Sequence, residues 1–324
     1  MDGDNHSGVP NELSTRSFSN YKPFDFISII KVTLSPILTF RVSVEKLKSI
    51  KTLIKDSKGL ESNQILYKLS SMKDFKYPEK LQKDYDLIEK KWNNRERNDY
   101  LRNQDNLCIS EFHIKDKKIY LSFCEAKYLQ RQILSECFGM LSDLDQEILL
   151  SDINDKKIKV PLAYKAVISI ITKDNNLLVV KRSSKVSTNK GKLDFSISKS
   201  AKIEDLEAKS FQPYQTVIRA LKEELNIDLD FKIAVKEKTI KITDFFFNKE
   251  TFSIGYSSIV DFRDSSMNIT SEQIFNLYKD AKNSWEISDI YFITNSQVQI
   301  KKELKKNQDK FTNHALKNIS EFID

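Results

Sequence analysis

Glycine is the residue that this sequence most clearly lacks. It has six glycines among 324 residues, whereas about 7% of residues is usual for proteins. They stand at Gly3, Gly8, Gly59, Gly139, Gly191 and Gly255. At this spacing no Walker A loop, dinucleotide-binding fingerprint or G-x-S-x-G nucleophile elbow can be assembled. The scarcity therefore excludes phosphate sites that are built from glycine-rich loops.

Histidine and cysteine are also rare, with three residues of each type: His6, His113, His314, Cys108, Cys124 and Cys137. The cysteines form no C-x-x-C pair, so the sequence disfavours a zinc or iron site of the usual His and Cys ligands. A metal ion bound by this chain would be a hard cation held by carboxylates. A cysteine on a strand or helix is by default a buried structural residue, which disfavours a thiol nucleophile paired with His113.

Long hydrophobic runs are missing as well. The longest, from Phe24 to Phe40, is interrupted by polar residues and by a proline, and it is too polar for a span of about 20 apolar residues. The first residues show neither the basic nor the apolar region of a signal peptide. We therefore expect no membrane association and predict a cytoplasmic location in which the thiols stay reduced.

The excess of positive charge is modest. Lysine and arginine number 53 against 46 acidic residues, which gives a net charge of +7. Residues 65–103 hold ten basic and seven acidic residues, a balance that is typical of a solvated helix surface and disfavours a nucleic-acid partner. The lysines of residues 44–56 keep a basic, nucleic-acid-associated protein open as a third interpretation, and a homo-oligomer is open too.

The pattern along the chain predicts an α+β protein of two domains. Residues 1–21 are polar and non-periodic, as in a flexible leader. A polar stretch before Pro161 predicts a boundary between an N-terminal α+β domain of unknown role, residues 22–158, and a second domain, residues 159–324. In the first domain we expect strands within 26–44, helices at 44–56, 81–101 and 125–141, and a strand pair at 108–113 and 118–123.

The second domain begins with a predicted β-hairpin, whose strands at 166–172 and 177–182 are joined by residues 173–176. A short alternating run at 193–198 and a strong helix from about Tyr214 to Leu225 follow. Further strands are predicted at 231–247, 252–262 and 285–294, and helices at 271–282 and 296–323.

The helix from about Tyr214 to Leu225 carries the candidate chemistry. Its spacing predicts a buried stripe of Ile218, Leu221 and Leu225, with Ala220, Glu223 and Glu224 together on another face. Arg219 lies four residues before Glu223 and could orient it by a charge-assisted hydrogen bond. A solvated helix face would have the same residues at the same spacing. The sequence on either side of this helix therefore has to distinguish a functional site from a solvated surface.

In its surroundings this region resembles the Nudix superfamily. The family's box ends in R-E-U-x-E-E-x-G-U, where U is a bulky apolar residue, and the segment from Arg219 to Ile227 reads RALKEELNI. A strand hairpin and the loop GKLDFS precede it, and WEISDIYFI near residue 290 looks like the family's late strand. The resemblance covers roughly residues 160–324.

The resemblance implies an α/β/α sandwich with a mixed sheet. It also implies a hydrolase that cleaves the pyrophosphate bond of a nucleoside diphosphate derivative with Mg²⁺ or Mn²⁺. Glu223 and Glu224 would hold the metal, and Arg219 would orient them. A metal held by carboxylates suits this reaction, because a divalent ion neutralises the pyrophosphate and activates the attacking water.

The chain departs from the family's box at four positions, one of which is Phe211 in the place of the box's upstream glutamate. Ala220 replaces a glutamate, which removes one candidate metal ligand, and Asn226 replaces the closing glycine. Asn226 can fill that place because asparagine also enters the left-handed conformation that ends helices. Asp205 stands where the box normally begins with glycine, and the loop around it looks rebuilt.

The missing carboxylate could come from another segment. Glu286 is the best candidate, as a further metal ligand or as the catalytic base, because it looks like the family's acidic residue before the late strand. Glu204, Asp205 and Glu207 are alternatives, and a surface role is the competing interpretation for each.

Three basic residues could bind the phosphates of the substrate: Arg182 through paired N–H groups of its guanidinium, and Lys181 and Lys192 through their ammonium charges. Two functions follow from these residues. The first is a divergent Nudix-type hydrolase. The second is a Nudix-fold module that has lost catalysis and only binds or senses a nucleotide or nucleotide-like diphosphate.

Overall fold

The computed structural model describes residues 49–69, 78–93, 105–155, 158–186, 189–207, 212–281 and 286–318. All of them belong to one compact unit, residues 42–324. The predicted leader and the predicted strands within 26–44 lie outside the described residues.

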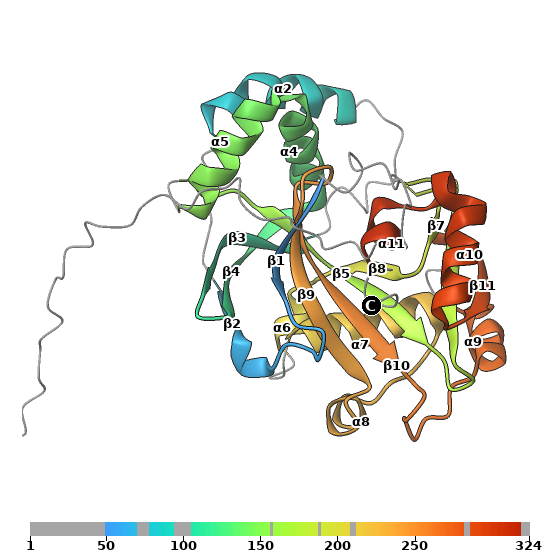
Figure 1. Ribbon diagram of the computed structural model, residues 1–324. Helices are drawn as coiled ribbons and strands as arrows, with labels where there is room; N and C mark the ends of the chain where they lie inside the picture. The colour runs from blue at the N-terminus through green and yellow to red at the C-terminus, as the bar shows by residue number, and fades with distance from the viewer. Residues whose placement is uncertain are drawn as a thin grey trace, which may run out of the picture. The chain divides into compact units, whose positions relative to one another are not determined.

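The strands of this unit form one mixed sheet (Figure 1). Its main path runs β1-β9-β10-β5-β3-β4-β2, and β6, β7, β8 and β11 branch from it through β5 and β6. The strands are β1 (Ile50–Lys55), β2 (Ile65–Leu69), β3 (Asp105–Lys115), β4 (Lys118–Lys127), β5 (Leu162–Ile171), β6 (Asn176–Arg182), β7 (Leu193–Asp194), β8 (Ile197–Ser200), β9 (Ile240–Asn248), β10 (Ser253–Asp261) and β11 (Ile287–Thr294).

The sheet is mixed because two of its pairs, β10 with β5 and β2 with β4, are parallel while the other pairs are antiparallel. The predicted domain boundary at 158–159 falls before β5, and β5 pairs with β3 through Cys108↔Ala163 and Ile109↔Leu162. Strand pairing does not measure whether either part folds alone, so the division into two domains stays a prediction.

The helices are α2 (Glu79–Asn93), α4 (Tyr128–Met140), α5 (Asp143–Asn154), α6 (Glu204–Glu207), α7 (Gln212–Leu225), α8 (Phe231–Lys236), α9 (Ser271–Tyr278), α10 (Gln297–Asn307) and α11 (Asn313–Asn318), with short 3₁₀ turns η1 (Ser62–Gln64) and η3 (Gln308–Lys310). In the part of the chain that the structure describes, no helix is both long and apolar enough to cross a membrane.

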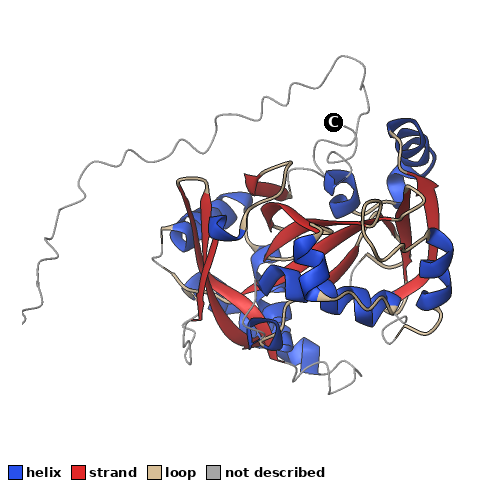
Figure 2. Cartoon of the chain, turned by 90° about the horizontal axis from the view of Figure 1, so that it is seen from below, coloured by secondary structure: helices blue, strands red, loops and turns tan. Residues whose placement is uncertain are grey.

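Helices lie on both sides of the sheet (Figure 2). Leu178 and Val180 of β6 belong to the larger core, which also holds Leu221 of α7. Leu177 and Val179, on the opposite side of the strand, belong to a second core that contains Ile300 and Leu304 of α10. Side chains along β6 therefore alternate between two cores, and helices pack on both sides of the sheet. This arrangement of sheet and helices confirms the α+β class.

The predicted elements around the candidate site are confirmed. β5 and β6 form the expected hairpin, whose turn uses Asn175 at a φ of +56°, a conformation that asparagine tolerates. β3 and β4 form the expected strand pair, and α7 covers the predicted helix. The three cysteines are buried, and burial raises the pKa of the Cys108 thiol to about 12, which fits structural residues.

Two predictions of secondary structure are wrong. The predicted helix at 44–56 contains strand β1, which pairs with β9 and has a bulge between Thr52 and Ile54. The bulge leaves neighbouring Leu53 and Ile54 both half-buried, and this mimics the apolar spacing of a helix. Residues 231–236 form helix α8 instead of the start of a strand, because Asp230 caps the backbone N–H groups of Lys232 and Ile233.

Candidate functional site

Helix α7 presents one face to the core and one to the candidate site. Val217, Ala220, Leu221 and Leu225 are buried in the larger core, whereas Ile218, predicted to be buried, is only partly so and packs against its edge. Ala220 was expected beside the glutamates but packs into the core. The helix ends at Leu225, and Asn226 follows with a φ of +57°, which confirms that it takes the place of a helix-ending glycine.

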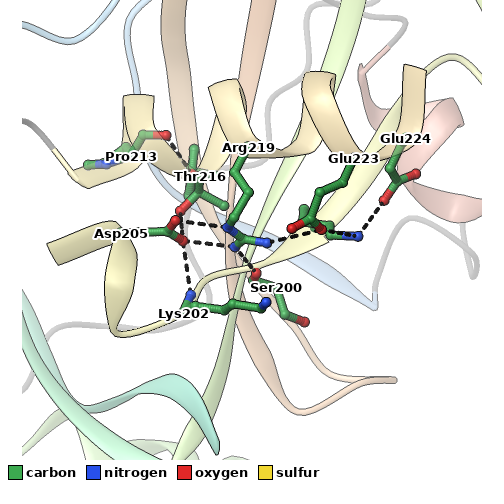
Figure 3. Close-up of polar contacts among 10 residues, drawn as sticks. Ser200, Lys202, Asp205, Pro213, Thr216, Arg219, Glu223 and Glu224 are labelled. Atoms are coloured by element: carbon green, nitrogen blue, oxygen red, sulfur yellow. Dashed lines mark hydrogen bonds and ion pairs between the residues drawn. The ribbon is translucent and has the colours of Figure 1, made fainter. Parts of the chain in front are cut away.

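Arg219 is held mainly by Asp205 and only secondarily by Glu223 (Figure 3). Its Nε and Nη2 donate to the Asp205 carboxylate at 2.9 and 2.8 Å, and Nη2 also donates to the Ser200 carbonyl at 2.7 Å. The distance from Nη1 to Glu223 Oε2 is 3.6 Å. The expected Arg219–Glu223 pair is therefore present as an ion pair, while the bidentate partner of the arginine is Asp205.

Three glutamates converge on the ammonium group of Lys199, which strand β8 provides. Lys199 Nζ lies 3.1 Å from Glu223 Oε2, 3.3 Å from Glu224 Oε1 and 3.8 Å from Glu286 Oε1. The side chain of Lys199 is 10% exposed and that of Glu224 is 3% exposed. The structure thus brings together the three predicted carboxylates, and it places a cation of the chain itself among them.

The charges of this cluster shift the pKa values of its members. Burial opposes ionisation of Lys199, but the carboxylates of Glu224, Glu286 and Glu223 outweigh it and raise the pKa of the ammonium. Burial, reinforced by Glu286, raises the pKa of Glu224 to about 8. Burial acts on Glu223 too, but Lys199 and Arg219 outweigh it and hold the pKa of this carboxyl below its ordinary value.

The donor set as arranged does not fit a divalent cation. Mg²⁺ takes oxygen ligands at about 2.1 Å, whereas the space between these oxygens is filled by the Lys199 ammonium at 3.1 to 3.8 Å. Among the described residues, no group of three or more His, Cys, Asp or Glu side chains is placed to hold a metal ion. Dependence on Mg²⁺ or Mn²⁺ stays a prediction.

The other acidic candidates lie beside the cluster. A groove of about 570 Å³ along α7 is lined by Glu204, Asp205, Gln215, Ile218, Arg219, Lys222, Glu223, Asn226, Asp228 and Asp280. Asp205 is engaged by Arg219, and the side chain of Glu207 lies outside the described residues. With five acidic residues against two basic ones, this groove repels phosphate.

Lys181 and Arg182, two of the predicted phosphate-binding residues, lie on opposite faces of β6. Lys181 lines a second groove of about 430 Å³, together with Lys306 of α10, Lys310 of η3 and Gly191. Arg182, the next residue, lies on the opposite face of the strand, because successive side chains of a strand alternate between its two faces. Lys192 lies in the loop beside Gly191, where its carbonyl accepts from Arg182 N at 2.8 Å.

This lysine groove carries one acidic residue, Glu303, which is already engaged. Tyr291 Oη donates to Glu303 Oε1 at 2.7 Å, and Asn307 Nδ2 donates to the same oxygen at 2.8 Å. None of the described residues forms an ion pair with the Lys181, Lys306 or Lys310 side chains in this structure. Their charge is therefore available to an anion.

Sequence reasoning missed Lys199, although a signal for it exists. Phe195, Ile197 and Ala201 are buried, and Lys199 shares their parity along an alternating stretch. A strand points every second residue to the same face, so this pattern predicts a lysine that points inward. The lysines of α10 and η3 were missed because only the folded chain brings them beside Lys181.

Comparisons with known proteins give structural likeness alone. No family model and no curated protein matches the chain. Among solved structures, the chain is similar to a bifunctional NMN adenylyltransferase/ADP ribose pyrophosphatase from Francisella tularensis, complexed with AMP and a manganese ion. The identity is 15% and the TM-score 0.33, over 58% of this chain and 48% of that one, so the chain matches about half of that enzyme's length.

Two further solved structures show a similar degree of likeness. A second structure of the Francisella enzyme has 16% identity and a TM-score of 0.33, over 75% of this chain and 74% of that one. A Nudix hydrolase from Alicyclobacillus acidocaldarius has 11% identity and a TM-score of 0.32, over 46% of this chain and 84% of that one. At these values, activity, substrate and metal have to be argued from the chain's own residues.

Proposed function

We propose that this chain is a nucleotide-binding module of Nudix type, which binds a nucleoside diphosphate or a similar ligand without metal-dependent hydrolysis. One observation carries the proposal: the Lys199 ammonium lies among the carboxylates of Glu223, Glu224 and Glu286. These are the carboxylates that a hydrolase of this kind would need for its metal. Ala220, buried in the core, supplies no further ligand.

The lysine groove supports a phosphate-bearing ligand. Lys181, Lys306 and Lys310 line it, and its single glutamate is held by Tyr291 and Asn307. A diphosphate would gain charge-assisted hydrogen bonds from these ammonium groups. The acid-rich groove along α7 offers no comparable cation cluster.

The test compares binding with turnover on the same purified protein. The ligands are ADP-ribose, dinucleoside polyphosphates, NAD, nucleoside triphosphates and capped RNA, each with Mg²⁺ or Mn²⁺ and each with a chelator. We expect at least one ligand to bind by calorimetry equally well with and without metal, and no product by chromatography.

Two results would contradict this proposal. Product that disappears in Glu223→Gln/Glu224→Gln would establish the divergent hydrolase instead. Failure of every ligand to bind would reject a nucleotide partner, and salt-dependent binding of DNA or RNA would then favour the nucleic-acid interpretation.

A further inference from the structure

Glu223, Glu224 and Glu286 reach one point from separate segments, and the group found at that point is an amine of the same chain. Glu223 and Glu224 come from the end of α7, and Glu286 directly precedes β11. We propose that Lys199 is the built-in cation of this cluster, that it takes the place of a divalent ion, and that its removal turns the cluster into a divalent-cation site. The inference rests on the proposed function in that it concerns the same three carboxylates. It adds what these carboxylates do when Lys199 is removed.

The position of the ammonium is fixed by the backbone that carries it. β8 pairs antiparallel with β5, with Lys199 opposite Ala166 and Ser200 opposite Lys165. The Ser200 carbonyl also accepts from Arg219 Nη2 at 2.7 Å. Since the residues on both sides of Lys199 Cα are held by the sheet and by α7, the side chain extends into the cluster from a rigid base.

The glutamates are held as firmly. Glu223 lies 3.6 Å from the guanidinium of Arg219, and the backbone carbonyl of Glu286 accepts from Ser183 N at 3.0 Å. Glu224 has almost no contact with solvent. Carboxylates in this arrangement repel one another unless a cation lies between them. Lys199 is the cation that the described residues provide at this point.

Lys199 and a divalent ion cannot occupy the cluster together. The oxygens surround Nζ at 3.1 to 3.8 Å, and a divalent ion needs them at about 2.1 to 2.5 Å. A neutral residue at 199 removes the one charge that all three carboxylates share, and Arg219 remains beside Glu223. The carboxylate oxygens need to close by about 1 Å to meet a metal at those distances, which rotation about the glutamate side-chain bonds allows while the backbone stays in place.

The experiment measures thermal unfolding without any nucleotide, so its outcome is independent of whether a nucleotide binds. The variants are Lys199→Met, which removes the charge, and Lys199→Arg, which keeps it. The probes are Mg²⁺, Mn²⁺ and Ca²⁺ alone, each against a chelator. Wild type and Lys199→Arg should show the same Tm with and without metal. Lys199→Met should start lower and gain about 5 °C with a metal at about 100 times its Kd.

Two control variants separate the cluster from the surface. Lys222→Met removes an exposed lysine, whose ion-pair partner Asp228 is also exposed, and its Tm should stay insensitive to metal. Lys199→Met/Glu224→Gln removes one ligand together with the lysine and should lose most of the metal response of Lys199→Met.

The proposal is overturned if Mn²⁺ binds wild type by calorimetry and this binding is lost in Glu223→Gln. It is also overturned if folded Lys199→Met shows no metal response. If Lys199→Met fails to fold without metal, refolding it in Mn²⁺ decides: recovery of the folded state supports the proposal, and continued failure while Lys199→Met/Glu224→Gln folds contradicts it.

Discussion

Arg219 and Asp205 form a bidentate pair in which the guanidinium Nε and Nη2 lie 2.9 and 2.8 Å from the two carboxylate oxygens. Asp205 also accepts from Thr216 Oγ1 at 2.8 Å and from the backbone N–H of Lys202 at 2.9 Å. The pair ties the short helix α6 to the middle of α7 (Figure 3). Asp205 thus has a structural role, and its carboxylate is already fully engaged.

Asp205→Asn should destabilise the protein by about 2 to 4 kcal/mol, because it removes the main counter-charge of a largely buried arginine. Urea denaturation measures the loss. Asp228→Asn is the control, since its ion pair with Lys222 is solvent-exposed and should change stability by about 0.5 kcal/mol or less. Equal effects of the two substitutions would contradict the assigned role of Asp205.

Gly255→Ala should be destabilising by about 1 to 3 kcal/mol through overpacking. A Cβ at this position would lie 2.7 Å from Phe246 Cε2, and Phe246 is buried. Phe246→Leu should recover part of the loss in the double variant. Gly139→Ala is the matched control: nothing lies within 4 Å of its Cβ position in α4, so the better helix former should stabilise by about 0.5 to 1 kcal/mol.

Asn226→Gly should leave stability within about 0.5 kcal/mol of wild type, whereas Asn226→Val should cost about 1 to 2 kcal/mol. The φ of +57° explains the difference, because a β-branched residue is strained in the left-handed region. Denaturant midpoints measure both effects. A valine variant as stable as the glycine variant would show that the turn after α7 tolerates other backbone conformations.

His314→Gln should weaken the acid sensitivity of the fold. Burial, together with the charges of Lys165, Lys317 and Arg182, holds the pKa of His314 well below its ordinary value of 6.5. Below that pH the unfolded chain takes up a proton that the folded chain does not, so stability is lost as pH falls. Denaturation between about pH 7 and pH 5 should show a smaller loss in the variant. An unchanged slope would contradict this assignment.

Lys181→Ala, Lys306→Ala and Lys310→Ala should each weaken binding of a diphosphate ligand about five- to tenfold and should flatten its salt dependence. Lys305→Ala is the control, because Lys305 is exposed on α10 and does not line the groove. Calorimetric titration at two salt concentrations measures both effects. Equal weakening in all four variants would indicate general electrostatic attraction without a defined groove.

The pattern of apolar and polar residues predicted correctly those helices and turns whose structure is determined by their own residues. The apolar spacing of α7 and the polar turn between β5 and β6 are properties of short segments, and both are confirmed. Strand β1 was predicted as a helix because Leu53 and Ile54 are adjacent apolar residues, a spacing that this strand accommodates through the bulge in its pairing with β9. Tertiary context overrides local preference in such cases.

The carboxylates of the candidate site were predicted from the sequence, but Lys199 and the pairing of Arg219 with Asp205 were not. The resemblance selected Glu223, Glu224 and Glu286, which the fold brings together around Lys199. The partner of Arg219 lies 14 residues away along the chain, in a segment whose spacing gave no periodic signal. Pairings of this kind depend on how loops pack, and a single sequence does not encode them in its spacing.

The cluster around Lys199 also bears on the order of folding. Its carboxylates and its lysine come from segments that are distant along the chain, and closing long loops is slow. An intermediate in which α7 has docked before β8 would set Glu223 and Glu224 against the sheet without their lysine. Such a species is disfavoured by charge repulsion, so we expect the pairing of β8 with β5 to precede or accompany the docking of α7.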